Sequence, residues 1–386
     1  MTSPMVFGAR KRVIKTLLWM RIAWLALRAY RNPRRAMSVV QRMIAERAKS
    51  QRFITGKYAQ SDGRYFWNFY SPGFPSRAFD RFVECELDRI EPFRGAPPAL
   101  QSAIFAITKR CPLQCEHCCE WAVLNDLESL SDADLHAIVQ RVRIRGVAQL
   151  FLSGGEPLRR FHDLLSVIEL ASSDADVWIL TSGHGLSEDR ARRLRSSGLT
   201  GVALSLDHWD AESHDRFRGL EGAYASVEHA ANSARDAGLV VALSLCPTRA
   251  FVSSDNLERY AETARHLGAS FIQILEPKAV GRYAGADVAL TTPQQRMLEQ
   301  FADRLNIDPA YRDFPAVAYA DFTKRSIGCF GAGDRYIYID TDGALHPCPF
   351  CRVPAGHALE GDFDDALARL QAAGCPARAE EVHAHG

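Results

Sequence analysis

The chain has 386 residues, of which 47% are apolar, and a formal net charge of +1. This composition excludes a disordered chain and a membrane-embedded bundle. The near-neutral charge argues against a protein that coats nucleic acid with its whole surface, so no nucleic-acid partner is expected. The length allows one large domain or two to three ordinary ones.

The charge is distributed unevenly along the chain. Residues 1–64, the basic head, contain 15 Lys and Arg but only 2 Asp and Glu, which gives +13 against −12 for the rest. Such a head either binds an anionic partner or docks on the acidic body of the same chain. The sequence leaves both possibilities open.

Two helices are predicted over residues 8–50, with a break at Asn32-Pro33. One apolar stripe runs along the first helix through Val13, Thr16, Leu17, Met20, Trp24 and Leu27. The helix also carries Lys15 and Arg21, and its apolar stretch is shorter than the roughly 20 residues needed to span a bilayer. No cleavage site follows, so we predict neither a signal peptide nor a transmembrane helix, and a cytoplasmic protein. This helix either lies on the inner face of a membrane or packs on the body with its arginines outside.

Residues 54–75 contain an aromatic, strand-like run after the turn Ser61-Asp62-Gly63. This run suits a hairpin core or the wall of a hydrophobic pocket better than base stacking. A short amphipathic helix is predicted over 77–90, and Gly95-Ala96-Pro97-Pro98 is the best candidate for a linker.

From residue 101, strand-like apolar runs alternate with helical patterns. The six predicted strands are 103–108, 148–152, 177–181, 201–206, 239–245 and 271–276. Near-continuous apolar strands separated by helices are typical of parallel βα units that are buried on both faces. Periodicity alone does not decide between an open doubly wound sheet and a partial barrel.

After Gly285 this alternation is expected to stop. A helix over 292–305 leads into a Cys-bearing tail, in which strands 335–339 and 344–346 flank the turn Asp340-Thr341-Asp342-Gly343. The predicted parts of the chain are therefore an N-terminal extension of helices and a hairpin, a βα core and a helix followed by a small Cys-rich domain, at 1–98, 99–285 and 286–386.

Ten cysteines are too few for a disulfide scaffold at this length, and their clustering indicates metal ligation in a reducing cytosol. Cys111, Cys115 and Cys118 lie on one loop directly after the first predicted strand. Three thiolates can bind three corners of a cubane Fe–S cluster, whereas a closed zinc site needs a fourth ligand. The competing interpretation is a zinc knuckle completed by His117 or Cys119.

Polar residues recur where the predicted strands end, as expected of an active-site face. The second strand ends in Ser153-Gly154-Gly155-Glu156-Pro157, where the two glycines admit a ligand close to the backbone and the carboxylate accepts a cationic group. The third strand ends in Thr181-Ser182-Gly183, the fourth in Ser205-Leu206-Asp207, and the sixth leads into Glu276-Pro277.

A loop with Cys-x3-Cys-x2-Cys after the first strand, followed by Gly154-Gly155-Glu156-Pro157 after the second, resembles the radical S-adenosylmethionine (SAM) enzymes. The resemblance covers about 101–285 well and 329–375 moderately, and it does not cover 1–100. It implies a partial (βα)6 barrel and a [4Fe–4S] cluster bound by Cys111, Cys115 and Cys118. SAM would chelate the open iron through its amine and carboxylate.

The resemblance also assigns SAM contacts residue by residue. The amine of SAM would contact the segment with Gly154, Gly155 and Glu156. The ribose or methionyl group of SAM would contact Ser205 and Asp207. Arg218 matches an arginine that pairs with the SAM carboxylate, a geometry that suits a guanidinium. His117 departs from the family, which has an aromatic residue there, but its flat ring is a plausible substitute.

The implied chemistry starts with a reduced cluster that donates one electron to SAM and breaks the S–C5′ bond. The resulting 5′-deoxyadenosyl radical abstracts hydrogen from a substrate C–H bond. A low-potential donor such as flavodoxin or ferredoxin would supply the electron.

A second cysteine set, Cys329, Cys348, Cys351 and Cys375, surrounds the predicted hairpin of the tail. Four thiolates suit a structural zinc or a second Fe–S cluster, and spacing alone does not separate them. In the radical SAM context the tail resembles the SPASM extension or its shorter twitch relative. One auxiliary cluster is expected because His357 stands where another Cys would follow, and zinc remains the alternative. Cys85 and Cys246 are expected in the core, and Cys119 as packing, a spare ligand or a reactive thiol, in that order.

Peptide or protein side chains are the commonest substrates of SPASM-type relatives, which predicts an oxidising or cross-linking peptide modifier. The alternatives are the same chemistry on a lipid or small metabolite at the membrane surface, and a non-enzymatic protein that keeps the metal only as structure. Peptide modifiers often begin with three strands and three helices, and the predicted order in residues 1–100 does not match that module.

Overall fold

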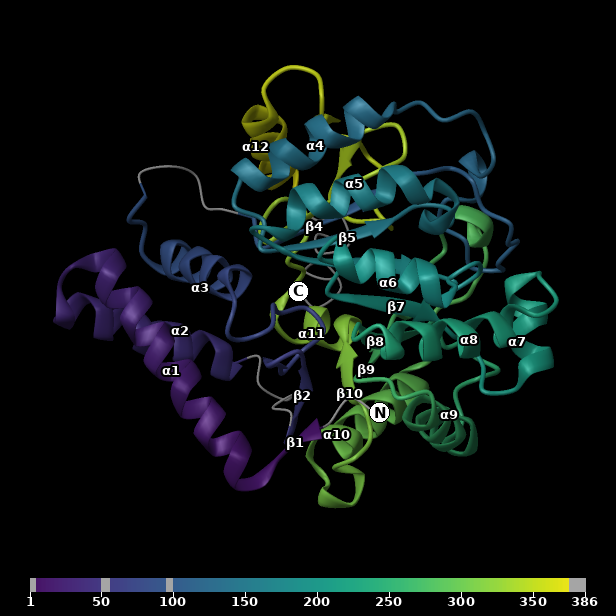
Figure 1. Ribbon diagram of the computed structural model, residues 1–386, viewed down its shortest axis with the longest axis horizontal. Coiled ribbons are helices and arrows are strands. Elements are labelled where there is room, and N and C mark those ends of the chain that lie inside the picture. The colour runs from purple at the N-terminus through teal and green to yellow at the C-terminus, as the bar shows by residue number, and fades with distance from the viewer. Residues whose placement is uncertain (1–4, 50–55, 95–99, 375–386) are drawn as a thin grey trace.

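The computed structural model describes residues 5–49, 56–94 and 100–374. Its centre is a ten-stranded sheet in the order β10-β9-β8-β7-β6-β5-β4-β11-β12-β13 (Figure 1). All neighbours from β10 to β11 are parallel, and they are β4 (Ser102–Ala106), β5 (Gln149–Ser153), β6 (Asp176–Thr181), β7 (Gly201–Ser205), β8 (Val240–Leu245), β9 (Phe271–Ile274), β10 (Ala316–Tyr319) and β11 (Tyr336–Ile339). This order confirms the partial barrel of parallel strands.

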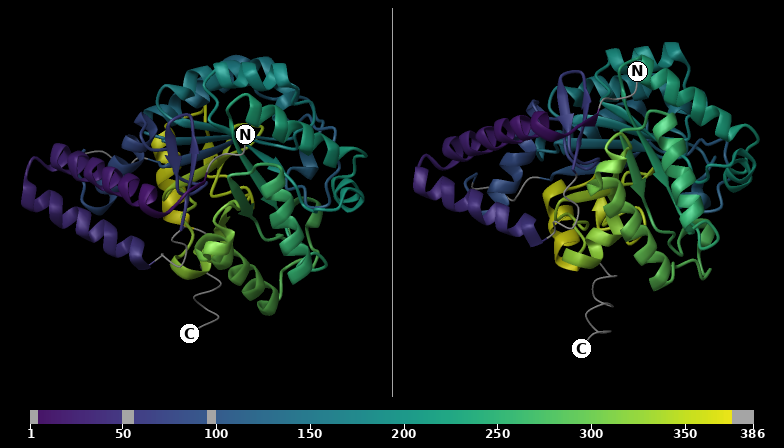
Figure 2. Two further views of the ribbon diagram at one scale, coloured as in Figure 1. Left: turned by 60° about the horizontal axis from the view of Figure 1, so that its bottom comes forward. Right: turned by 90° about the horizontal axis from the view of Figure 1, so that it is seen from below.

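Helices connect the parallel strands and wrap around the outside of the curved sheet (Figure 2). They are α4 (Asp132–Ile144), α5 (Phe161–Ser172), α6 (Glu188–Ser196), α7 (Ala211–Arg218), α8 (Ala223–Asp236), α9 (Ser254–His266) and α10 (Thr292–Ile307). Ser131, Ser187 and Ser253 stand at the N-termini of α4, α6 and α9, where each hydroxyl accepts a backbone N–H of the first turn.

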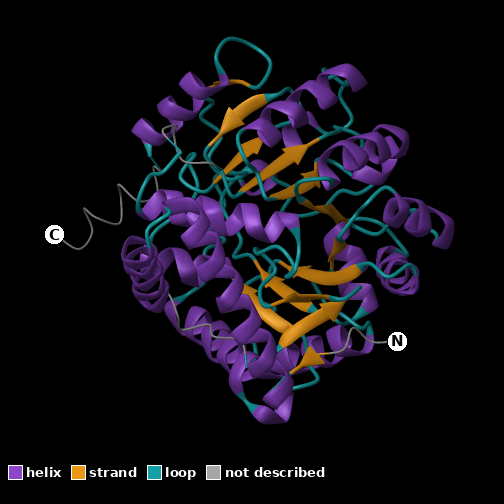
Figure 3. Cartoon of the chain, turned by 60° about the vertical axis from the view of Figure 1, so that its left-hand side comes forward, coloured by secondary structure: helices purple, strands orange, loops and turns teal. Residues whose placement is uncertain are grey.

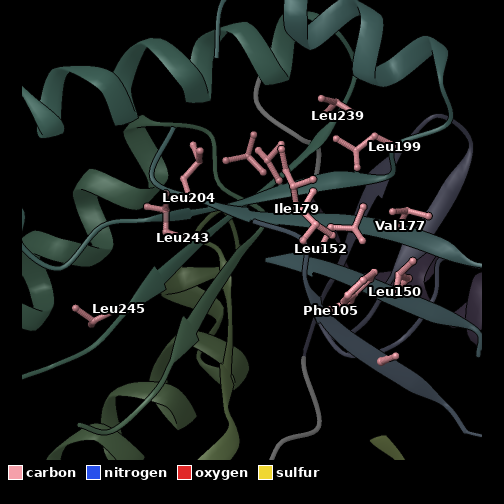
Figure 4. Close-up of a cluster of buried hydrophobic side chains, with 14 of the residues drawn as sticks. Phe105, Leu150, Leu152, Val177, Ile179, Leu199, Leu204, Leu239, Leu243 and Leu245 are labelled. Atoms are coloured by element: carbon pink, nitrogen blue, oxygen red, sulfur yellow. The ribbon is translucent and has the colours of Figure 1, made fainter. Parts of the chain in front are cut away.

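The main core lies between the strands and these outer helices. Figure 4 shows it as a layer of aliphatic side chains that includes Leu150, Leu152, Ile179 and Leu243, all at most 1% exposed. Because the strands are covered on both faces, they read as continuous apolar runs in the sequence.

The expectation that the alternation stops after Gly285 is wrong. Helix α10 crosses over to β10, which pairs in parallel with β9 as a seventh βα unit, and β11 adds to the opposite edge beside β4. The sequence Ala316–Tyr319 is short and rich in alanine, so it lacks the β-branched signal that marks the other strands. The domain division at 285 stays a prediction, since the sheet itself continues past that residue.

The N-terminal residues form two helices, a small sheet and a third helix. These elements are β1 (Met5–Val6), α1 (Gly8–Tyr30), α2 (Pro33–Lys49), β2 (Tyr58–Ser61), β3 (Arg64–Phe66) and α3 (Arg77–Ile90). Helices α1 and α2 form an antiparallel pair that projects beside the barrel, with α3 packed against them (Figures 1 and 2). The linker predicted at 95–98 lies outside the described residues.

Helix α1 buries the face opposite to its predicted stripe. Ile14, Leu18, Ile22 and Leu25 are at most 8% exposed and pack in a core with α2 and α3. The stripe itself, from Val13 to Leu27, faces solvent. The helix is apolar on nearly all sides, so its periodicity does not identify the buried face.

The end of β3 and the residues that follow it up to 75, here called the hairpin segment, place aromatic side chains inside the barrel. Phe66 and Phe69 are 1% and 0% exposed, and Phe69 contacts the barrel residues Trp178 and Phe151 at ring-centroid distances of 5.0 and 5.4 Å. Arg64 also pairs with Asp176 at the start of β6, with 2.6 Å between Nη1 and Oδ1. The predicted hairpin core is thus also part of the barrel core.

The tail forms α11 (Ala320–Ile327), β11, β12 (Ala344–His346), β13 (Gly356–His357) and α12 (Phe363–Ala373). The predicted hairpin is confirmed, because β11 and β12 pair in antiparallel fashion around Gly343. These strands continue the central sheet beyond β4, and Figure 3 shows the strands of the molecule inside a shell of helices. Within the described ranges, none of the helices combines the length and the apolar character that crossing a bilayer requires.

Candidate active site

The loop with Cys111, Cys115 and Cys118 follows β4 at the C-terminal mouth of the barrel, and all three side chains line one cavity of about 930 Å³. The C-terminal end of α7 supports this loop, because the N–H of Gln114 donates to the Arg218 carbonyl at 3.0 Å and that of Glu116 to the Phe217 carbonyl at 3.0 Å. Residues distant in sequence therefore determine where the thiols lie.

A second support for the loop comes from Arg282, which sequence reasoning missed. Its backbone N–H donates to the Cys118 carbonyl at 2.9 Å, and its guanidinium donates to the Gln114 carbonyl at 2.5 Å. The Cys111 N–H donates to Asn125 Oδ1 at 2.9 Å. No local motif marks Arg282 or Asn125, because their roles depend on the fold.

The Gly154-Gly155 pair lets β5 approach this loop. Gly154 has a φ of +135°, and a Cβ on Gly155 would lie 2.5 Å from the Arg110 carbonyl oxygen. The Gly155 N–H donates to Thr108 at 2.7 Å and the Glu156 N–H to Arg110 at 2.8 Å. The glycines thus bring the strand end against the backbone of the cysteine loop, as well as lining the cavity.

Glu156 is 1% exposed, and its carboxylate accepts four hydrogen bonds. Oε1 accepts from Thr181 Oγ1 at 2.6 Å and from the Leu158 N–H at 3.1 Å, while Oε2 accepts from the Ser182 N–H at 2.8 Å and Oγ at 2.5 Å. An ionised carboxylate has about four acceptor positions, so these donors occupy them. Glu156 therefore joins the ends of β5 and β6, and its direct contact with a cationic ligand stays a prediction.

Asp207 and Arg218 form a buried ion pair on the cavity wall, with 2.5 Å between Oδ2 and Nη2. Arg218 also donates to the Cys115 sulfur at 3.5 Å, and Asp207 accepts the Cys246 N–H at 2.9 Å. Burial acts against both charges, but Asp207 and the Cys115 thiol raise the pKa of Arg218, and the guanidinium keeps the pKa of Asp207 below its ordinary value. Both groups are charged at neutral pH beside the cysteine loop.

His117 stacks on Phe217 with 5.0 Å between ring centroids and an interplanar angle of 26°. Burial lowers the pKa of His117 to about 4, so the ring is neutral at neutral pH. His117 Nδ1 and Arg218 Nε are buried and have no hydrogen-bond partner within the described part of the chain. Such polar atoms are normally satisfied, so they mark a place where a ligand's polar groups fit.

The donor set fits a cluster better than a single ion. Burial raises the pKa of the Cys111 thiol to about 12 and that of Cys118 as well, so a bound metal must displace their protons. Among the described residues, no three His, Cys, Asp or Glu side chains are arranged to hold one metal ion. A zinc knuckle made with His117 or Cys119 would need such a group around one ion, whereas the thiolates of a cubane cluster each bind a separate iron atom.

The cavity extends from the cysteine loop to the N-terminal helices. Its lining includes Ser205 at the end of β7, Trp19 of α1, Phe79 of α3, and Trp67 and Tyr70 of the hairpin segment. The predicted pocket wall of aromatic residues is therefore confirmed. All predicted SAM contacts and the three loop cysteines line this same cavity, whereas the N-terminal contribution from α1 and α3 was not predicted.

Three of the four tail cysteines interact with one another or with Tyr336, which lines the cavity. The Cys348 and Cys351 thiols share a hydrogen bond, which lowers the pKa of Cys348 to about 6. The Tyr336 hydroxyl forms a hydrogen bond with Cys329, and burial together with the charge of the nearby Cys348 thiolate raises the pKa of Tyr336. Cys375 lies outside the described residues. His357 is not directed at this set, because its ring nitrogens bond to the Asp342 carbonyl at 2.7 Å and the Leu359 N–H at 3.1 Å.

The remaining cysteines lie in three different surroundings. Cys85 is 0% exposed on α3 and Cys246 is 8% exposed after β8, which confirms that both are buried, although Cys246 also lines the cavity. Burial raises the pKa of the Cys119 thiol to about 11. Its neighbour Glu120 accepts from Tyr338 and Arg352, a link between the cysteine loop and the tail that sequence reasoning missed.

Comparison with known proteins identifies the family. The model of the radical SAM superfamily matches residues 105–267. The chain is 30% identical over 260 residues to a PqqA peptide cyclase of Ruegeria pomeroyi, covering 65% of this chain and 68% of that protein. It is 24% identical over 296 residues to an AdoMet-dependent heme synthase of Nitratidesulfovibrio vulgaris, covering 69% and 78%.

Solved structures share the fold. The Streptococcus suis protein SuiB bound to its precursor peptide SuiA matches with a TM-score of 0.59 at 16% identity, over 90% of this chain and 81% of that chain. The protein anSMEcpe with bound AdoMet matches with a TM-score of 0.54 at 18% identity, over 69% and 79%. Neither the lipid alternative nor the non-enzymatic alternative is favoured by these relatives. The chain belongs to the radical SAM superfamily and is a radical SAM enzyme, which implies a [4Fe–4S] cluster and SAM as its cofactors.

Proposed function

We propose that this radical SAM enzyme abstracts hydrogen from a C–H bond of a peptide or protein substrate that binds in the cavity. The observation that carries the proposal is the continuity of this cavity, which reaches from the cysteine loop to α1, α3 and the hairpin segment. The part of the cavity beside the cysteine loop suits the cofactors, and the part lined by aromatic side chains leaves an apolar space for a substrate. The names of two of the relatives, a peptide cyclase and a protein bound to its precursor peptide, support a peptide.

The residues of the chain then have distinct roles. Cys111, Cys115 and Cys118 hold the cluster, which together with SAM supplies the 5′-deoxyadenosyl radical. Arg218, which Asp207 keeps charged, pairs its guanidinium with the methionyl carboxylate of SAM. The flat stack of His117 on Phe217 offers a surface for a planar base. Gly154, Gly155, Glu156 and Ser205 complete the SAM contacts, and Glu156 exchanges one of its present hydrogen-bond donors for the SAM amine. The aromatic wall excludes water.

The tail holds a second cofactor in this proposal. Cys329, Cys348, Cys351 and Cys375 bind one auxiliary [4Fe–4S] cluster, in support of which three of them interact with one another or with Tyr336 of the cavity wall. A flavodoxin or ferredoxin delivers electrons in the cytoplasm. A Cys348→Ser variant is expected to lose about four iron atoms per chain relative to the wild type after reconstitution. Bound zinc with no such loss of iron would contradict the auxiliary cluster.

The peptide substrate is tested with synthetic short peptides encoded beside this gene. The reconstituted wild-type enzyme is incubated under anaerobic conditions with dithionite, SAM and each peptide, and the products are analysed by mass spectrometry. We expect one peptide to raise the rate of 5′-deoxyadenosine formation and to change its own mass. A protein that cleaves SAM but leaves every such peptide unchanged would contradict the peptide proposal.

A further inference from the structure

Helix α1 turns an apolar ridge to solvent. Val13, Leu17, Met20, Trp24 and Leu27 are between 44% and 60% exposed and follow one another at spacings of three and four residues. Of the 14 large apolar side chains that are exposed in the described part of the chain, 8 fall within residues 7–44. This concentration distinguishes the apolar ridge from the scattered exposed side chains of an ordinary surface.

The fold of the helix does not depend on this ridge. The opposite face packs through Leu18, Ile22 and Leu25 against α2 and α3, and Lys15 and Trp19 on the same helix line the cavity. One side of α1 therefore packs against the rest of the chain, and the other side exposes a line of apolar side chains to solvent.

The ridge is bordered by cations. The guanidinium groups of Arg21 and Arg28 lie over the Trp24 ring, at 4.3 and 5.6 Å from its centroid. Arg21 pairs with Asp80, whereas four other arginines of α1, α2 and the turn between them form no ion pair within the ranges that the structure describes, namely Arg12, Arg28, Arg31 and Arg34. Part of the basic head is thus neutralised by the body and part is left for an external anion.

We infer that the apolar ridge of α1 binds the surface of an anionic membrane, with the helix axis parallel to the bilayer. Apolar side chains with a Trp, bordered by Arg and Lys, are the composition of helices that lie in a membrane interface. Anionic lipid attracts each cation near the surface. Two copies of the chain placed ridge to ridge would bring the same cations together, so charge opposes self-association through this face. The cavity, which α1 lines with its other face, would then lie on the side of the helix away from the membrane.

The test is flotation of the full chain with vesicles, which needs neither cofactor nor substrate and so succeeds or fails independently of the proposed reaction. The wild type is expected to float with vesicles of equal parts phosphatidylglycerol and phosphatidylcholine, and not with phosphatidylcholine alone. High salt weakens the binding because it screens the cations. A Leu17→Glu, Met20→Glu variant is expected to bind at least about tenfold more weakly, since it places two acids on the ridge.

The matched control carries the same change of charge elsewhere. Ile144 and Ile307 are 77% and 57% exposed on other helices, and an Ile144→Glu, Ile307→Glu variant is expected to float like the wild type. Circular dichroism verifies that both variants fold. Absence of wild-type flotation, or equal weakening in both variants, overturns the proposal. A wild-type dimer that the ridge variant dissociates, without vesicle binding, would assign the ridge to a second copy instead.

Discussion

Individual side chains of the site lie where the sequence places them, but several have partners that it does not reveal. Glu156 was predicted at the cavity from its strand end, and it lines the cavity, yet its oxygens accept from Thr181 and Ser182 of the neighbouring strand. Arg218 was expected to face a ligand carboxylate and pairs with Asp207 in this structure. The place of a site residue follows from the order of the strands in the sequence, whereas its hydrogen-bond and ion-pair partners depend on how adjacent strand ends pack.

Lys57 gives a pH-dependent prediction at this scale. Its side chain is buried, and its ammonium donates to the carbonyls of Tyr311 at 2.6 Å and Phe314 at 2.5 Å. Burial lowers the pKa of Lys57 to about 7, and Asp313 only partly opposes this. A neutral amine keeps two N–H donors for the two carbonyls, so it can lose its proton without losing these bonds.

The sign of the effect follows from proton binding. Between about pH 7 and pH 10 the unfolded chain holds one more proton at Lys57 than the folded chain, so stability rises with pH in this window. The free energy of unfolding of the wild type minus that of Lys57→Met should rise by about 1.4 kcal/mol per pH unit there. Urea unfolding of both proteins at several pH values measures it, and a difference independent of pH would contradict the burial of a neutral amine.

At the scale of elements, regular units were predictable and irregular ones were not. Six parallel strands and the tail hairpin follow from apolar runs and turn residues, whereas β10 escaped because Ala316–Tyr319 carries little strand signal. The buried face of α1 could not be predicted either, since both Leu17 and Leu18 are apolar and only packing on α2 and α3 separates them.

The contact between β5 and the cysteine loop gives a prediction for this scale. A Gly155→Ala variant places a Cβ 2.5 Å from the Arg110 carbonyl oxygen and 3.0 Å from Cys111 Cβ, so the loop must move. We expect a loss of about 1–3 kcal/mol in stability and less iron per chain after reconstitution. Iron analysis measures this. The control is Gly285→Ala, which strains a left-handed backbone position at φ +76° but whose Cβ meets no atom within 4 Å, so it destabilises the chain without touching the loop. Equal iron content in the two variants would show that the contact does not position the cysteines.

At the scale of the whole molecule, the N-terminal residues share a core and a cavity wall with the barrel. The hairpin segment inserts Phe66 and Phe69 among barrel residues, and α1 and α3 line the cavity that the cysteine loop shares. The sequence separated residues 1–98 by their charge and by the absence of family motifs, and neither property reports long-range packing. The composition of the head therefore predicted its basic surface but not its place in the cavity wall.

Because Phe69 packs inside the barrel, we expect the N-terminal residues and the barrel to unfold together. A Phe69→Ala variant should lose about 3–5 kcal/mol, because a fully buried ring against Trp178 is replaced by a cavity. Urea unfolding monitored by circular dichroism and by tryptophan fluorescence should still give coincident transitions. The control Val353→Ala, at a side chain 69% exposed, should change stability little. Separate transitions of the N-terminal residues and the barrel would contradict their common core.

The central claim is that the loop after β4 generates the radical. It is tested by measuring 5′-deoxyadenosine after anaerobic reconstitution of the full chain with iron and sulfide, followed by dithionite and SAM. The wild type and the control Cys85→Ala, whose thiol lies in α3 away from the cavity lining, should form 5′-deoxyadenosine, and Cys115→Ser should form none. Product from Cys115→Ser at the wild-type rate, or no product from a wild type that contains its cluster, would contradict this account.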